Sequence, residues 1–245
     1  MSAINAITDR VARWLPPVLV IVAAAGLRSL ETGLLAPESR ERPRLAALAG
    51  SGGSLAVLGG MRSAVASGFW LRANLAWESR DAAETTALLY LTVAADERPL
   101  SFWLNGARML AYDLPEWRIE PGSPAAWQER IRTEHAAVAL AFLHRGEEWR
   151  GPAPEFTMEM ATIRLRVLGD QEGAARLYRQ AAEQPGAPYY AARIHGELLR
   201  GLGRPAEALA WLRQILPGLP EDDPAARRDV VEQRIKELES VVGEG

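Results

Sequence analysis

Apolar positions recur along most of the chain at intervals of three and four residues, which is the spacing of one face of a helix. Trp70, Ala73 and Trp77 show this spacing in the first such stretch of the body. Runs of valine, isoleucine or threonine that would indicate strands are few, and proline, glycine and aspartate divide the stretches. The pattern predicts an all-α protein with helices at 61–79, 82–95, 100–112 and 125–144, and a loop at 113–124.

A repeat distance of 34 residues organises the stretch 155–220. The first unit supplies Gly169, Ala174, Tyr178 and Ala181, which correspond to Gly203, Ala208, Leu212 and Ile215; Ala161 and Leu165 likewise correspond to His195 and Leu199. A fixed period of this length is typical of stacked units that bury their apolar faces on one another. We therefore expect helix pairs to follow each other in this part of the chain.

One more helix is expected after the repeats, in residues 221–245. Asp223 and Pro224 match a helix N-cap and the first helical position. The apolar stripe consists of Val231, Ile235, Leu238 and Val242. Glu232 and Lys236 are spaced for an ion pair. The segment is predicted to be a C-terminal capping helix.

The N-terminal residues 1–31 contain the uncharged run 14–27, WLPPVLVIVAAAGL, with two arginines before it and one after it. The run favours a membrane segment, either an anchor that is retained or a signal cleaved after the alanines at 23–25. A buried or surface helix is the third interpretation. The basic flank predicts that the body is exported, with a cytoplasmic protein as the alternative. Gly, Pro, Ser and Arg in 32–60 predict a linker.

The period and residue types resemble the tetratricopeptide repeat, a helix–turn–helix unit of the same length. In both units a small residue, Ala174 or Ala208, follows five positions after the turn glycine, and Tyr178 or Leu212 comes four later. Gly196 matches the glycine of the family's first helix, where the earlier unit has Thr162 instead.

This resemblance covers two regular units in 151–220 and extends loosely over 61–150. The loose part rests on Ala87, Leu91, Ala94, Pro99, Phe102, Asn105, Gly106 and Met109. The resemblance implies an α-solenoid of antiparallel helix pairs. With its N-terminal hydrophobic helix, the layout is similar to that of bacterial envelope-associated repeat proteins.

Tetratricopeptide arrays use the inner surface formed by their first helices to hold a peptide or partner helix. The resemblance nominates Phe156, Glu159, Ile163 and Arg166 in one unit, and Tyr190, Arg193, Glu197 and Arg200 in the next. Tyrosine and arginine are frequent at binding hot spots. The alternative is a solvated helix face held by pairs such as Arg193 with Glu197.

Composition excludes several classes of function. The chain has 28 basic and 31 acidic residues and a net charge of −3, which argues against nucleic acid as the main partner. Without cysteine it has no thiolate metal site or cysteine nucleophile. His135, His144 and His195 lack metal-ligand spacing, and no nucleophile or phosphate-loop motif is present. We expect no cofactor, no metal and no catalysis.

Tryptophans gather in 61–150, where they are either core or the lining of a ligand groove. Trp117 falls in the predicted loop, so it is expected to be a lid or a contact for another chain. The sequence thus favours a membrane-tethered, non-catalytic scaffold that binds a peptide or partner subunit. The alternative is an exported helical enzyme or ligand-binding protein with a tryptophan-rich pocket in 61–150.

Overall fold

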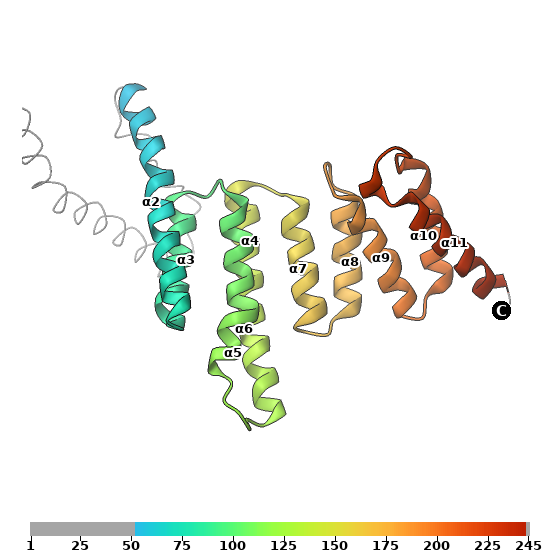
Figure 1. The fold of residues 1–245 in the computed structure, drawn as a ribbon, viewed down its shortest axis with the longest axis horizontal. Coiled ribbons are helices and arrows are strands. Elements are labelled where there is room, and N and C mark those ends of the chain that lie inside the picture. The colour runs from blue at the N-terminus through green and yellow to red at the C-terminus, as the bar shows by residue number, and fades with distance from the viewer. Residues whose placement is uncertain (1–51, 244–245) are drawn as a thin grey trace, which may run out of the picture. The chain divides into compact units, whose positions relative to one another are not determined.

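The structure, a computed structural model, describes residues 52–243, with side chains from Met61 onward. Every regular element in this range is a helix (Figure 1), which confirms the all-α prediction for these residues. The predicted membrane segment 1–31 and most of the linker 32–60 lie outside the described residues. Among the helices that are described, none is both long and apolar enough to cross a membrane.

The elements follow one another with short connections. They are α2 (Gly52–Glu78), α3 (Ala82–Ala95), α4 (Leu100–Arg108), the π-helical turn η2 (Met109–Asp113), α5 (Leu114–Arg118), α6 (Ala125–Arg150), α7 (Pro154–Arg166), α8 (Gln171–Ala182), α9 (Tyr189–Gly201), α10 (Pro205–Ile215), the 3-10 turns η3 (Leu216–Gly218) and η4 (Pro224–Ala226), and α11 (Arg228–Gly243). The prediction of a helix at 82–95 is confirmed. Asp81 caps it by accepting a hydrogen bond from the Glu84 amide at 2.8 Å.

Two segments that were predicted to be non-helical are helical in part. Helix α2 begins at Gly52, inside the predicted linker, because alanine, leucine and valine among the glycines continue the helix. The predicted loop 113–124 is helical in its first half, where η2 runs into α5. Pro115 does not prevent this, because it lies in the first turn of α5, where a proline loses no needed amide hydrogen bond.

Neighbouring helices in the sequence pack on each other. Helix α4 packs on α6 and α6 on α7, and the chain continues with α7 on α8, α8 on α9, α9 on α10 and α10 on α11. Figure 1 shows α7, α8, α9 and α10 side by side with alternating direction. Equivalent positions of the sequence repeat have equivalent structures. Gly169 and Gly203 both have positive φ, at 63° and 72°, and Ala174 and Ala208 are both fully buried.

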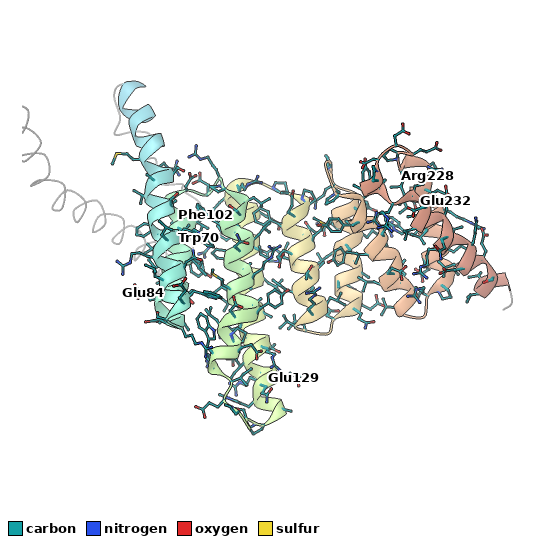
Figure 2. The ribbon with its side chains drawn as sticks, in the orientation of Figure 1. Trp70, Glu84, Phe102, Glu129, Arg228 and Glu232 are labelled. Carbon is teal, nitrogen blue, oxygen red and sulfur yellow. The ribbon has the colours of Figure 1, made fainter. Side chains whose placement is uncertain are left out.

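The largest core cluster joins α2 to α7 around Trp103, which has no exposed surface. Its ring contacts Phe142 at a centroid distance of 4.9 Å and Phe156 at 6.4 Å. Gly146 makes this packing possible, because a Cβ there would lie 2.7 Å from the Phe156 ring. At the edge of the cluster Trp70 packs on Phe102 at 5.3 Å (Figure 2).

The C-terminal segment differs in detail from its prediction. Asp223 caps the 3-10 turn η4, and α11 begins only after Arg227, which has a left-handed backbone. Three members of the apolar stripe are buried, whereas Val242 is 37% exposed. Glu232 pairs with Arg228 at 2.9 Å (Figure 2) and not with Lys236.

Candidate functional site

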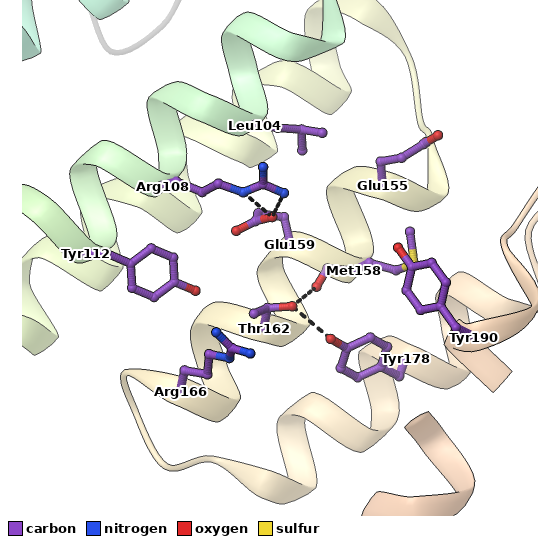
Figure 3. Close-up of a pocket in the computed structure, with 10 residues that line it drawn as sticks. All are labelled: Leu104, Arg108, Tyr112, Glu155, Met158, Glu159, Thr162, Arg166, Tyr178 and Tyr190. Atoms are coloured by element: carbon purple, nitrogen blue, oxygen red, sulfur yellow. Dashed lines mark hydrogen bonds and ion pairs between the residues drawn. The ribbon is translucent and has the colours of Figure 1, made fainter. Parts of the chain in front are cut away.

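The described residues contain a groove between α4–η2 on one side and α7, α8 and α9 on the other, with a volume of about 470 Å³ (Figure 3). We call it the groove. It is lined by Leu104, Arg108, Tyr112, Glu155, Met158, Glu159, Thr162, Arg166, Tyr178 and Tyr190. Three phenols, two guanidinium groups and two carboxylates therefore face one space, which suits a ligand with several polar groups.

An ion pair crosses the groove between α4 and α7. Arg108 donates from Nε and from one terminal nitrogen to Oε2 of Glu159, at 3.0 and 2.7 Å. Glu159 is 6% exposed, whereas the Arg108 side chain is 51% exposed, so the pair joins a buried carboxylate to a half-exposed guanidinium. The hydrogen bond to Glu159 raises the pKa of Arg108, against the effect of its partial burial. The pair fixes two helices that are distant in the sequence.

Below this pair, hydroxyl groups form a short chain of hydrogen bonds. The Thr162 hydroxyl donates to the Met158 carbonyl at 2.9 Å, and the Tyr178 hydroxyl lies 2.8 Å from the Thr162 oxygen. Because the Thr162 hydrogen is used, the Tyr178 phenol is the donor of the second bond. The phenol keeps its lone pairs and can still accept a hydrogen bond from a ligand.

Tyr112 projects into the groove from the π-helical turn. Its hydroxyl oxygen is buried and has no hydrogen-bond partner among the described residues. Burial, followed by the nearby Glu159 carboxylate, raises the pKa of Tyr112 to about 12. The phenol is therefore protonated at neutral pH and offers a donor.

The groove brings together some of the positions nominated from the sequence. Glu159, Arg166 and Tyr190 all line it, and Tyr190 is 44% exposed. Phe156 and Ile163 do not, because both are fully buried in the core cluster around Trp103. Their prediction as contact positions is wrong, since the opposite face of α7 packs against α4 and α6.

The later nominated positions on α9 have partners in η4, in α11 or within α9 itself. Arg193 donates to the carbonyls of Ala225 and Ala226 at 3.1 and 2.8 Å. Glu197 accepts from Arg200 at 2.9 Å and from Arg234 of α11 at 2.6 Å. None of the three nominated α9 side chains lines the groove, and the alternative pair of Arg193 with Glu197 does not form.

Trp117 lies in α5 and not in a loop. Its ring packs near that of Trp77 at a centroid distance of 6.4 Å, and it borders the core cluster. Trp77 in turn donates to the Asp113 carboxylate at 3.0 Å. No tryptophan is among the residues that line the groove.

Sequence reasoning missed Arg108, Tyr112, Thr162 and Tyr178 as groove residues. The first two come from a helix with no regular repeat register. For the second two the sequence did hold a signal: Thr162 and Tyr178 replace Gly196 and Leu212 of the next unit together. A paired change from apolar to polar at two positions that meet in space marks a polar surface.

In the part of the chain that the structure describes, no three His, Asp or Glu side chains lie close enough together to bind a metal ion. His195 is buried, with Nδ1 2.8 Å from the Ala175 carbonyl and its ring against Trp211. Burial lowers its pKa, so the ring acts as a neutral packing group.

No protein-family model matches the chain, and a search of curated proteins finds no relative.

Proposed function

We propose that the protein is a non-catalytic interaction scaffold that holds a peptide or partner subunit in the groove. The observation that carries this proposal is the mixed lining of Tyr112, Tyr178 and Tyr190 with Arg108 and Glu159. Tyrosine and arginine supply large contact area and directed hydrogen bonds, which is the chemistry of protein-binding hot spots.

The array around the groove is, in this proposal, a tetratricopeptide-like α-solenoid. The sequential packing of α7 to α11 and the matching positive φ at Gly169 and Gly203 support it. In such an array α4, α7 and α9 are the first helices of successive pairs, and α11 is the cap. The groove then lies on the inner surface, where the first helices meet.

The second part of the proposal is that residues 1–31 tether the scaffold to a membrane, with the body exported. It rests on the uncharged run 14–27 and its basic flank. Extraction of cell membranes with sodium carbonate tests it. The full-length chain is expected in the pellet, whereas a chain without 1–31 is expected in the supernatant. Release of the full-length chain would reject the tether.

Site-specific photo-crosslinking tests the groove. A benzophenone amino acid replaces either Tyr190 in the groove or Trp127 at the start of α6, outside it. The two side chains are matched, since they are 44% and 45% exposed. We expect one discrete crosslinked partner from position 190 and none from 127. Equal crosslinking at both positions, or none at 190, would reject the groove as the binding surface.

A further inference from the structure

The outer face of α2 is apolar and exposed. Leu71 and Leu75 lie on it with 66% and 64% of their surface exposed, more than any other large apolar side chain that the structure describes. Met61, at 54%, continues this face towards the N-terminus. The opposite side of α2 packs into the core cluster around Trp103 through Ala73 and Ala76, so the leucines point away from the core. Exposed apolar surface of this kind is typical of protein interfaces.

The first and last described helices differ on their outer faces. A terminal helix of a stacked array needs a polar outer face to stay soluble. Helix α11 has such a face, since Gln233, Lys236 and Glu237 are all exposed. Helix α2 has leucines there instead, so it presents surface that a further helix could bury.

Gly68 lies on the same face of α2, in the interior of a helix, where glycine is less favourable than alanine. Other interior glycines of the described helices make room for a neighbouring helix. A Cβ at Gly106, Gly146 or Gly196 would lie 3.0, 2.7 or 2.9 Å from a side chain of that helix. At Gly68 no atom lies within 4 Å of the Cβ position. The close approach of a helix from another molecule would give this glycine the role that the other three have.

Two sets of positions on this face repeat every seven residues, as in helices that pair lengthwise. They are Met61, Gly68 and Leu75 in one set, and Ala64, Leu71 and Glu78 in the other. The small residues precede the leucines along α2. When two copies of α2 lie antiparallel across a two-fold axis, Leu71 of each copy therefore faces Gly68 of the other, and Leu75 faces Ala64. A parallel pair would place leucine on leucine and leave a gap at glycine, so the face complements itself in the antiparallel direction.

The charges beside this face are compatible with a second copy. Arg72 borders the face near the two-fold axis, so the two copies bring their Arg72 side chains towards each other. In each chain Glu84 of α3 (Figure 2) pairs with Arg72 at 2.7 Å. Each guanidinium is thus already neutralised, and the two pairs together alternate positive and negative groups across the axis.

The pairing of two α2 helices gives a short interface. The segment from Met61 to Glu78 is roughly 26 Å long. Contacts of this size hold weak dimers, with dissociation constants of about a micromolar or higher. We therefore expect monomer and dimer to exchange, with the protein concentration deciding which one dominates.

We propose that the outer face of α2 is a self-association surface, and that its occupant is α2 of a second copy of this chain, antiparallel across a two-fold axis. The inference goes beyond the proposed function, because no residue that lines the groove lies on α2. The dimer carries two grooves, so a partner with two binding segments would be held by both.

Sedimentation equilibrium of the full-length chain in a density-matched detergent tests the association. We expect a dimer to form as the concentration rises to about 0.1 mM. The double change Leu71→Gln and Leu75→Gln should leave only monomer over the same range. Val241→Gln is the matched control, since Val241 is 59% exposed on α11, and it should dimerise like the native chain. A native chain that stays monomeric, or a leucine variant that dimerises equally well, would overturn the proposal.

Gly68→Ala separates association from folding, because the two effects have opposite signs. In the dimer the new methyl group meets Leu71 of the other copy, so the dissociation constant is expected to rise about tenfold. In a chain diluted to monomer the same change should raise the urea concentration of half-unfolding, through helix propensity. An unchanged or tighter dimer would contradict the close approach at Gly68.

The leucine variant needs the same check on its folding. At a dilution where the chain is monomeric, it is expected to unfold at the same urea concentration as the native chain, because both leucines are exposed there. A lower urea concentration would assign the leucines to the fold of the single chain and would overturn the proposal.

Introduced thiols report the direction of the pair, since the chain has no cysteine of its own. Full-length Met61→Cys and Glu78→Cys chains, distinguished by tags of different mass, are mixed and oxidised. We expect a disulfide mainly between the two variants. A disulfide that forms mainly between two Met61→Cys chains would show a parallel pair and overturn the antiparallel arrangement.

A benzophenone amino acid at position 71 identifies the occupant directly. We expect a crosslinked product with twice the mass of the chain, joined through α2 of both copies. A product of single-chain mass that maps to residues 1–51, or a crosslink to a different protein in place of the dimer, would overturn the proposal. Neither outcome affects the groove, whose crosslink from position 190 is measured separately.

Discussion

The Tyr178 hydroxyl donates to the Thr162 oxygen at 2.8 Å, at the position where the next unit packs Leu212 on Gly196. A Cβ at Gly196 would lie 2.9 Å from Leu212 Cδ2, so that contact requires glycine. One unit thus joins its helices by close apolar packing and the other by a hydrogen bond. The hydrogen-bonded unit is the one that forms the floor of the groove.

Thr162→Val is expected to destabilise the contact of α7 with α8 by about 1–3 kcal/mol, because it leaves the 5%-exposed Tyr178 phenol without an acceptor. Hydrogen exchange of the α7 and α8 amides measures the change. Tyr178→Phe should cost less, since Thr162 still donates to the Met158 carbonyl. The double variant should be close to Tyr178→Phe alone. If the loss in the double variant equalled the sum of the two single losses, the Thr162 and Tyr178 side chains would not interact energetically.

Gly146→Ala is expected to lower the free energy of unfolding by about 1–3 kcal/mol, because the new methyl group meets the Phe156 ring and approaches Trp103 at 3.0 Å. Urea unfolding followed by tryptophan fluorescence measures it. Gly68→Ala in α2 is the matched control, since no atom lies within 4 Å of its Cβ position. That variant should gain up to about 1 kcal/mol from helix propensity. A loss in both would point to backbone effects instead of packing.

Arg193→Ala is expected to lower the free energy of local opening of η4 and the start of α11 by about 1–3 kcal/mol, because two carbonyls of η4 lose their charged donor. Faster hydrogen exchange in α11 relative to α7 is the measurement. Arg200→Ala breaks an exposed pair with Glu197. It should change the opening free energy measured by hydrogen exchange by no more than about 1 kcal/mol. Similar effects of the two variants would contradict the anchoring role of Arg193.

Acid is expected to destabilise the protein through Asp96, which is 1% exposed. Hydrogen bonds from the Arg98 side chain lower the pKa of Asp96, and burial opposes this in part. The unfolded chain therefore takes up this proton at a higher pH than the folded chain does. The contribution is complete above about pH 4 and is lost as pH falls through the folded pKa. Thermal unfolding at stepwise lower pH should show this loss, and Asp96→Asn should show a smaller dependence.

Periodicity was sufficient to predict the helices of the body, because an apolar stripe and a capping residue such as Asp81 act within a few turns of the chain. It failed at 113–124, where Pro115 and the following glycine and prolines suggested a loop. There the buried Leu110 and Leu114 hold the chain helical through η2 and α5. Tertiary packing overrides local turn signals at that point.

The groove could be predicted only in part. Glu159, Arg166 and Tyr190 belong to the repeat register and were found from it. Arg108 and Tyr112 could not be found in this way. They lie in α4 and η2, which are more than 40 residues before α7 in the sequence and share no repeat with it. Phe156 was misplaced for a similar reason, since Gly146 on another helix makes the space that buries it.

The three core clusters within residues 61–243 give this part of the chain a stability that varies along its length. One cluster spans α2 to α7, a small one containing Met158 and Tyr178 spans α7 to α9, and a third spans α9 to α11. Helices that pack mainly on their sequence neighbours can open from one end while the rest stays folded. The groove lies at the small middle cluster, so a segment bound there would couple the two larger clusters and make them unfold as one cooperative unit.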